Sequence, residues 1–370
     1  MSTLAVELDP AEPDAIADLG DGGDGIRRAA VVIGVPLVAV IGAMTIGGIL
    51  IWREGVNPFA VFADVLRGVF VDKRGLQNTA VSATPLLLMG LGLAVAYRAR
   101  LFTIGAEGQF VIGAIAATAF ATTGGISGLP GWLLIPACMV IAAVVGGLWS
   151  GISALLSNRY NTSVVISSLL LTYVAAAIMQ WLIRVGVRDP ESFVAASRVI
   201  GDAALPTVPG LNTHLGFVIA VALVPVFALV MSRTRFGYRV DVIGHNPIAL
   251  RSNEVSTGRM LFAVLGLVGV MSGLAGYIQV AGVTNRINAE FSVGYGYTAI
   301  IVALLGRLNP VGVLIAALGV AGLDIGFAAA ERNNQLPSSL VGVIQALLII
   351  FVVIGDAVAV KFISRSDSGR

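Results

Sequence analysis

Residues 131–156 read GWLLIPACMVIAAVVGGLWSGISALL, a run that contains no charged side chain. A helix rises about 1.5 Å per residue, so about 20 apolar residues cross the roughly 30 Å hydrocarbon core of a bilayer. Such runs recur along the 370-residue chain, in which 57% of the residues are hydrophobic and 12% are charged. Soluble domains carry about 25% charged residues. The sequence therefore predicts an all-α, polytopic transmembrane helical bundle.

The apolar runs predict about ten membrane spans and two tails. The spans are expected at 29–51, 79–97, 105–123, 131–156, 163–184, 216–232, 260–280, 294–306, 311–330 and 340–360. The eighth is short and is followed by Arg307 and the break at Asn309-Pro310, so a partial or tilted helix is expected there. Residues 1–28 are rich in acidic residues and glycine, which is typical of a disordered tail. Residues 29–361 then form the membrane domain, and 362–370 form a second short tail.

The distribution of Lys and Arg predicts the orientation. Positively charged short loops of membrane proteins face the cytoplasm. A cytoplasmic N-terminus places most of the 23 basic residues in cytoplasmic segments, so we expect both termini to be cytoplasmic. The external segment 52–78 contains VFADVLR at 61–67, which predicts a short amphipathic helix at the membrane interface.

Composition and missing motifs exclude several functions. A net charge of +2 with scattered arginines does not favour a nucleic-acid partner. The phosphate-binding pattern GxxxxGK[ST] is absent, and the lysines are Lys73 and Lys361, so no ATP hydrolysis is expected on this chain.

Cys138 is the single cysteine and is expected to pack between helices. His214 and His245 are expected in loops on opposite sides of the membrane, which disfavours an intramembrane enzyme with a histidine base. We expect no catalytic residue, cofactor or metal in this chain.

The segment FTIGAEGQF at 102–110 places Glu107 and Gln109 where a predicted helix enters the membrane. A charge at the centre of a membrane helix costs about 2.5 to 3.5 kcal/mol on insertion scales, so a polar segment at that depth should face protein or water. The alternative is an interfacial Glu at a helix N-terminus, stabilised by the helix dipole. Both interpretations remain open from the residues. Asp324, between Gly322 and Gly326 in the ninth span, is expected either to pair inside the bundle or to line a path.

The predicted cytoplasmic segment 233–259 reads RTRFGYRVDVIGHNPIALRSNEVSTGR. Asn246-Pro247 is a typical helix start, because proline is preorganised for the first helical position, and Gly244 before it allows a sharp turn. These features favour a short helix lying across the cytoplasmic face. A solvated loop is the alternative.

Five segments together resemble one family of bacterial importer permeases. They are FTIGAEGQF at 102–110, NTSVVISSLLLTYVA at 161–175, RTRFGYRVDVIGHNPIAL at 233–250, MSGLAGYIQVAG at 271–282 and GYGYTAIIVALLGRLNPVG at 294–312. Their order and spacing over residues 79–360 are similar to the permeases that serve branched-chain amino acids, simple sugars and nucleosides. The resemblance is strongest to the nucleoside branch, which is linked to basic membrane proteins.

The resemblance implies a permease subunit of an ATP-binding-cassette importer in the bacterial inner membrane. Its implied partners are a cytoplasmic ATPase that binds ATP and magnesium, a second similar permease, and an external solute-binding lipoprotein. A heterodimer of permeases is favoured over a homodimer. The expected cargo is a small polar solute, a nucleoside first and a simple sugar next.

The resemblance also implies two sets of functional residues. The segment that couples the ATPase to the membrane domain matches Gly244, His245, Asn246, Pro247 and Ala249. We expect the translocation path near Glu107, Gln109, Tyr173 and Asp324.

The chain departs from the family pattern at several positions. Thr172 stands where an Asn is usual, and Asp241 and His245 stand where Arg and Glu are common. The resemblance therefore implies the fold without transferring individual solute contacts. The alternative function is a proton-coupled secondary transporter that works without an ATPase, in which Glu107 or Asp324 relays protons.

Overall fold

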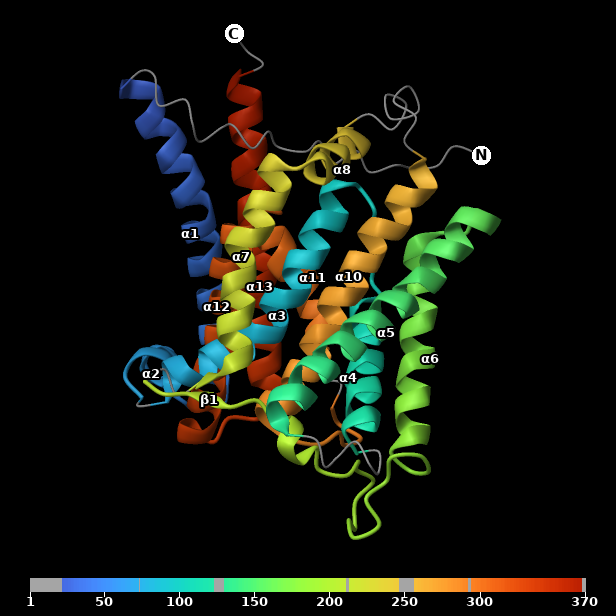
Figure 1. The fold of residues 1–370 in the computed structure, drawn as a ribbon. Helices are drawn as coiled ribbons and strands as arrows, with labels where there is room; N and C mark the ends of the chain where they lie inside the picture. Colours follow the sequence, from blue (N-terminus) through green and yellow to red (C-terminus); the bar gives the residue numbers. More distant parts are fainter. Residues whose placement is uncertain are drawn as a thin grey trace. The chain divides into compact units, whose positions relative to one another are not determined.

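The structure of the chain is a computed structural model that describes residues 22–72, 74–122, 130–210, 213–245, 256–291 and 294–367. Within these ranges the regular structure is helical except for one small antiparallel sheet of two strands (Figure 1). The predicted all-α helical bundle is confirmed. Residues 1–21 of the predicted tail lie outside the described ranges, and the first helix begins at Gly22.

Seven helices of the described chain are long and apolar enough to cross a membrane, or eight if one bent pair is counted as a span. Each of the seven covers one predicted span. They are α3 (Gly75–Arg98), α5 (Gly131–Tyr160), α6 (Val164–Leu182), α7 (Leu215–Arg233), α10 (Thr257–Gln279) with its π-helical continuation η3 (Val280–Thr284), α12 (Pro310–Asn334) and α13 (Ser338–Asp367).

The bent pair consists of α1 (Gly22–Arg53) and α2 (Pro58–Phe70), which meet at 117°. Gly55 has a φ of 78°, which glycine adopts without a steric penalty, so the chain turns sharply there. The Asn57 side chain then accepts a hydrogen bond of 2.9 Å from the Phe59 N–H and starts α2. The amphipathic helix predicted at 61–67 is therefore present as part of α2.

The two remaining predicted spans are short helices, α4 (Ala106–Thr122) and α11 (Tyr295–Leu305). With 17 residues, α4 is at the lower limit for crossing a bilayer. The 11 residues of α11 extend about 16 Å, roughly half of a bilayer core. The expectation of a partial eighth helix is confirmed. A helix lies at each of the ten expected spans, but α4 and α11 are shorter than expected.

The chain forms two compact units, one from residues 1–66 and 327–370 and the other from residues 67–326. In the first unit α1 packs against α13, where Gly42 lies beside Phe351 and Gly47 beside Ile344. The Asn334 amide also donates a 2.9 Å hydrogen bond to the Asp64 carboxylate in this unit. The second unit, residues 67–326, contains every predicted functional residue that the structure describes.

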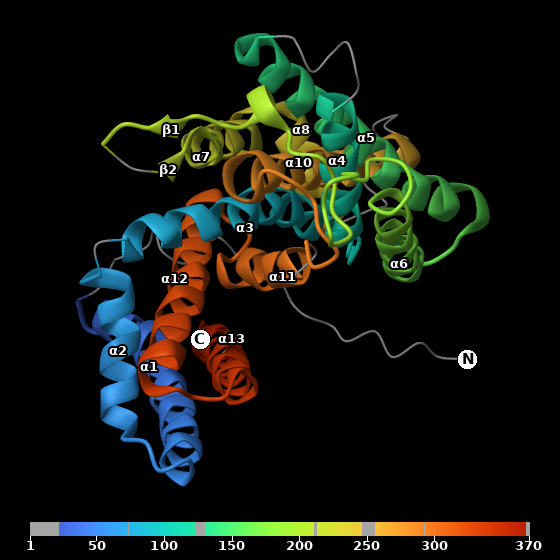
Figure 2. The same cartoon turned by 90° about the horizontal axis from the view of Figure 1, so that it is seen from below.

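Helix α10 lies among α3, α4 and α5 and forms the centre of the second unit (Figure 2). Gly269 and Gly273 are four residues apart and face α5, where an added side chain would overlap the carbonyls of Gly146 and Ala142. Small residues at this spacing allow close backbone contact between membrane helices. Gly269 and Gly273 therefore have a packing role in the contact between α10 and α5. Cys138 of α5 is buried and unbonded to another cysteine, as expected for a packing residue.

The segment between α6 and α7 folds back on the end of α10. It contains the short helix η2 (Gly201–Ala203) and the strands β1 (Thr207–Val208) and β2 (Thr213–His214), paired with Thr207 opposite His214. The buried Tyr277 hydroxyl donates a 2.8 Å hydrogen bond to the Ala203 carbonyl. Helix α7 follows β2 directly and is connected by a tight turn to α8 (Arg235–His245). These contacts tie both ends of α7 to neighbouring elements.

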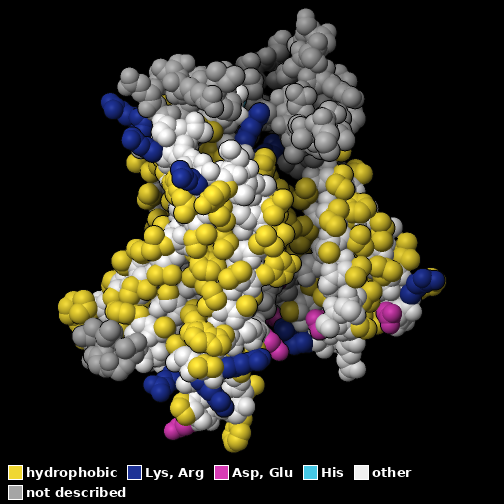
Figure 3. All heavy atoms as spheres, turned by 90° about the vertical axis from the view of Figure 1, so that its right-hand side faces the viewer, with side chains coloured by type: hydrophobic (Ala, Val, Ile, Leu, Met, Phe, Trp, Pro, Cys, Tyr) yellow, Lys and Arg dark blue, Asp and Glu magenta, His cyan; other side chains and the backbone are white. Residues whose placement is uncertain are grey.

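The surface seen in Figure 3 has the polarity expected in a bilayer. Hydrophobic side chains cover the middle of this face, and Lys and Arg side chains gather toward its two ends. Exposed large apolar side chains on α5 and α6 include Val140, Leu148, Ile166 and Leu170. Exposed apolar helix surface is stable where lipid or another membrane subunit covers it.

Candidate functional site

The polar segment before α4 runs into the interior of the second unit. Thr103 and Gly105 are buried, and the Thr103 carbonyl accepts a 2.9 Å hydrogen bond from the Tyr97 hydroxyl. The Ile104 N–H donates to the Ser168 hydroxyl of α6 at 3.2 Å. A side chain at Gly108 would lie 2.8 Å from the Thr172 Cα, so glycine is needed there for the close approach of α6. The segment therefore faces protein, as its polarity predicts.

Glu107 joins the starts of the two short helices. Its side chain is 2% exposed, and its carboxylate accepts hydrogen bonds from the Gly294 N–H, at 3.1 Å, and from the Gly296 N–H. These N–H groups belong to the start of α11, where no preceding turn supplies acceptors. The negative charge also complements the positive end of the α11 dipole. Glu107 thus lies at a helix N-terminus and is also buried in protein, so the two interpretations of this residue are compatible.

Further polar groups surround Tyr295, the first residue of α11. Its side chain hydrogen-bonds with Gln279 at the end of α10 and lies close enough to Glu107 and Asp324 for electrostatic interaction. The Phe110 ring packs 6.0 Å from the Tyr295 ring. Glu107 and Asp324 therefore both act electrostatically on Tyr295. We call Glu107, Gln279, Tyr295 and Asp324 the polar cluster.

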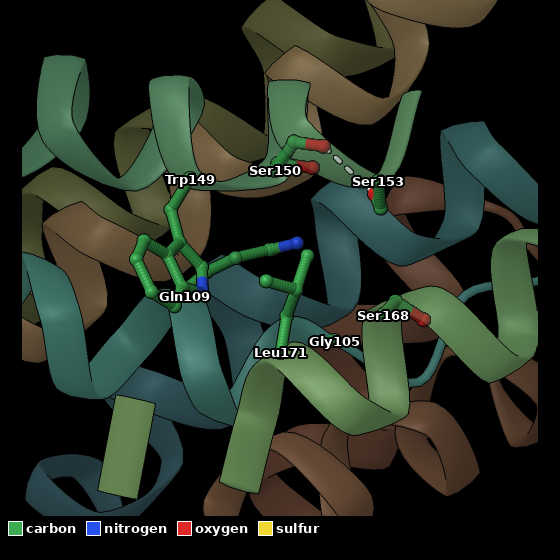
Figure 4. Close-up of a pocket in the computed structure, with 7 residues that line it drawn as sticks. All are labelled: Gly105, Gln109, Trp149, Ser150, Ser153, Ser168 and Leu171. Carbon is green, nitrogen blue, oxygen red and sulfur yellow. Dashed lines mark hydrogen bonds between the residues drawn. The ribbon is translucent and has the colours of Figure 1, made fainter. Parts of the chain in front are cut away.

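Gln109 lines a separate small recess between α4, α5 and α6 (Figure 4). The Gln109 side chain is 1% exposed, and its Oε1 atom and the Trp149 indole N–H have no hydrogen-bond partner among the described residues. The lining residues are uncharged and mainly polar. They are Gly105, Gln109, Trp149, Ser150, Ser153, Ser168 and Leu171.

The recess is too narrow to hold a solute molecule in this arrangement. The Ser150 hydroxyl donates a 2.6 Å hydrogen bond to the Leu265 carbonyl, and the Ser153 hydroxyl donates a 2.7 Å hydrogen bond to the Ser150 carbonyl. Both hydroxyls are therefore already satisfied. The unsatisfied groups are those of Gln109 and Trp149. Buried polar groups without partners are costly, so these two atoms are the hydrogen-bonding groups of the recess that are left to be satisfied.

Comparison with known proteins assigns the chain to a family. The family model described as "Branched-chain amino acid transport system / permease component" matches residues 75–353. The chain belongs to this family. The match includes α3 to α12 and most of α13, and hence both the polar cluster and the recess.

Several named permeases are similar over most of their length. The chain is 34% identical to the glucose ABC transporter permease protein TsgB13 of Haloferax volcanii, over 87% of each chain. It is 28% identical to the nucleoside ABC transporter permease protein NupB of Lactococcus lactis, over 89% of this chain and 91% of the relative. It is 27% identical to the guanosine ABC transporter permease protein NupP of Bacillus subtilis, over 89% and 94%. No solved structure matches.

Tyr173 of the permease lies apart from the recess and the cluster. Its side chain is 65% exposed on α6, whereas the neighbouring Thr172 is buried against Gly108. Tyr173 does lie within electrostatic range of Tyr297 on α11. Its place on the path remains a prediction.

Only part of the predicted coupling segment falls within the described residues. Gly244 and His245 end α8, while Asn246, Pro247 and Ala249 lie outside the described ranges. The expectation of a sharp turn at Gly244 is wrong, because this residue continues α8 and has no positive φ. A glycine is needed there for space, since an added side chain would overlap the Arg98 carbonyl. The His245 Nδ1–H donates a hydrogen bond of 2.8 Å to the Asp241 carbonyl.

Sequence reasoning missed Gln279, Tyr295 and Trp149. Gln279 and Tyr295 lie inside two of the segments that carry the family resemblance, which was the available signal. Nothing in the sequence marked Trp149 as a functional residue, because a Trp in an apolar run ordinarily packs against lipid or neighbouring helices.

Proposed function

We propose that this chain is the permease subunit of an ATP-binding-cassette importer that moves a small, uncharged polar solute into the cytoplasm. The observation that carries the proposal is the family match across residues 75–353, together with relatives named as ABC transporter permeases for glucose, nucleosides and guanosine. The chain lies in the bacterial plasma membrane with both termini in the cytoplasm.

The proposed solute is a nucleoside, with a simple sugar as the second candidate. Gln109 and Trp149 line an uncharged recess with free hydrogen-bonding atoms, which suits the hydroxyl and carbonyl groups of a neutral solute. The Trp149 ring adds an aromatic surface on which a nucleobase stacks. The glucose and nucleoside relatives support both candidates.

The proposed mechanism uses the two short helices. Helices α4 and α11 begin inside the second unit, and hydrogen bonds to Glu107 join their first turns. Each short helix can then move as a rigid piece against the longer helices around it. Opening the recess requires α4, α5 and α6 to separate. The permease then exchanges between two arrangements, and the energy for the exchange comes from a partner that binds them unequally.

The proposed partners are an ATPase that carries ATP and magnesium, a second permease, and an external solute-binding lipoprotein. The separate ATPase follows from the absence of a phosphate-binding loop in this chain. Two different nucleoside permeases of Lactococcus lactis, NupB and NupC, are similar to the chain at 28% and 24% identity, which supports a heterodimer.

The proposal is tested by purifying the tagged chain from native membranes in mild detergent and identifying the proteins that remain bound. We expect an ATPase with a phosphate-binding loop, a second permease and a solute-binding lipoprotein. Thermal-shift titration of that lipoprotein with uridine, adenosine, guanosine and glucose then identifies the solute. A chain that purifies alone and transports with a proton gradient would overturn the proposal in favour of a secondary transporter.

A further inference from the structure

Arg98, the last residue of α3, contacts two elements that are distant in sequence. Its Nε–H donates a 2.9 Å hydrogen bond to the Leu308 carbonyl, in the turn between α11 and α12. One of its terminal nitrogens lies 3.9 Å from the Asp241 carboxylate of α8. Arg98 therefore connects α8 to the end of α11.

The backbone of the same residue supports α8. Gly244 packs directly on the Arg98 carbonyl, so that any side chain at position 244 would overlap it. Gly244 and Asp241 are three residues apart and face the same side of α8. Both the main chain and the side chain of Arg98 thus hold the last turn of α8 before residues 246–255.

The turn after α11 has an unusual backbone. Arg307 and Leu308 have φ values of 51° and 56°, in the left-handed region that non-glycine residues rarely adopt. Such conformations persist where the surrounding contacts hold them in place. The hydrogen bond from Arg98 to the Leu308 carbonyl is a contact of this kind.

Helix α11 connects this turn to the polar cluster. It has 11 residues without a break, and its first turn is bound to Glu107 at the start of α4. The contacts therefore form a continuous series: α8, Arg98, the turn at Leu308, α11, Glu107 and α4. A rigid element held at both ends carries a displacement from one end to the other.

We propose that Arg98 is a positioning residue that couples movement of α8 to movement of α11 and so to the polar cluster and the start of α4. This inference rests on the proposed function, because coupling has meaning only if an ATPase acts on the α8 end of the permease. The hydrogen bond to Leu308 carries most of the effect. The pair with Asp241 is partly exposed, at 23% and 44% for the two side chains, and exposed ion pairs contribute little.

The test compares ATP hydrolysis with uptake in proteoliposomes that contain the full complex purified with the tagged chain. Arg98→Met is expected to keep ATP hydrolysis within about twofold of the wild type while uptake per ATP falls by roughly tenfold, the range expected for a coupling residue. Arg98→Lys, which keeps a charged donor, is expected to recover most of the uptake. Arg159→Met, at an exposed arginine on α5, serves as the control and is expected to stay within about twofold.

Three outcomes overturn the inference. The first is a normal ratio of uptake to hydrolysis in Arg98→Met. The second is a parallel loss of both activities with no recovery in Arg98→Lys, which would make Arg98 a structural residue only. The third is a loss in Arg159→Met equal to that in Arg98→Met. Failure of the proposed function is recognised separately, because the wild-type complex would then show no uptake driven by ATP.

Discussion

At the scale of single residues, Glu107 explains why a carboxylate occurs in a largely apolar sequence. Its position between two glycines at a helix entry left a buried and an interfacial interpretation open, and the structure shows that the side chain is buried. Its partners could not be predicted, because Gly294 and Gly296 are nearly two hundred residues away and offer backbone N–H groups that no residue type reveals. Gln109 was expected near the translocation path, while the recess that it lines depends on Trp149 from another helix.

Replacement of Glu107 by Gln is expected to destabilise the protein. The amide keeps the size of the side chain but loses the charge, and hydrogen bonds to charged groups contribute about 1.5 to 3 kcal/mol. The measurement is the thermal unfolding midpoint of the purified chain in detergent, which should fall by several degrees. Glu54→Gln, at an exposed position after α1, is the control. Equal midpoints for both variants would show that the contact with α11 is dispensable.

Replacement of Gln109 by Leu is expected to separate stability from transport. Leu removes a buried polar atom without a partner, so the unfolding midpoint should stay equal or rise. The concentration of solute at half-maximal uptake should increase by roughly tenfold, because a hydrogen bond to the solute is lost.

The matched control for Gln109 is Thr118→Val. Thr118 is also in α4, and its hydroxyl is buried without a partner among the described residues, but it does not line the recess. This variant should leave uptake unchanged. If both variants impair uptake equally, the recess has no special role in transport.

At the scale of elements, apolar runs were sufficient to place the helices. They were less informative about helix ends, because the ends of α4 and α11 depend on tertiary partners such as Glu107. The sequence also indicated a helix start at Asn246-Pro247 and did not predict α8, whose mean composition is polar and whose position is set by packing on Arg98. Glycines in the helices are not equivalent: Gly269 and Gly273 make close contacts, whereas an added side chain at Gly151 would meet nothing within 4 Å.

The contact between α5 and α10 predicts opposite effects for two glycine substitutions on one helix. Gly273→Ala should lower the unfolding midpoint, because the new methyl group overlaps the Ala142 carbonyl. Gly266→Ala meets nothing within 4 Å, and alanine is favoured over glycine in a helix by about 1 kcal/mol, so this variant should be at least as stable as the wild type. A stabilised Gly273→Ala variant would contradict the packing described for α10.

The junction of β2 and α7 predicts a dependence of stability on pH. The His214 ring is buried against Gly216 and Gly282, its nitrogens have no partner among the described residues, and burial lowers its pKa below the ordinary value of 6.5. The folded protein therefore holds His214 neutral, while the unfolded chain takes up a proton below about pH 6.5. The contribution to stability is present above this pH and is lost progressively as the pH falls.

This dependence is measured as the change in unfolding midpoint between pH 7.5 and pH 5.5. The change should be smaller in His214→Gln than in the wild type, whatever the midpoint of the variant at neutral pH. His245→Gln, at an exposed site, should retain the wild-type change. An unaltered change in His214→Gln would assign the pH dependence to other groups.

At the scale of the whole molecule, composition alone was enough to predict a membrane helical bundle, and the combination of five segments predicted the family. The two compact units were not predicted, because the first unit pairs the N-terminal and C-terminal helices and hydropathy carries no information about long-range pairing. The second unit, residues 67–326, brings together the polar cluster, the recess and α8. In the proposed function this unit holds the path, and partner chains supply the energy and capture the solute.

In the proposed function, transport through this chain is driven by ATP that is hydrolysed on a partner chain. The most direct measurement is uptake of a radiolabelled nucleoside by vesicles that contain the purified complex, with ATP enclosed on the side of the α8 segment. We predict uptake that requires ATP, persists when a protonophore removes the proton gradient, and is competed by unlabelled solute. Uptake that persists without ATP and stops when the protonophore is added would contradict the claim and identify a proton-coupled transporter.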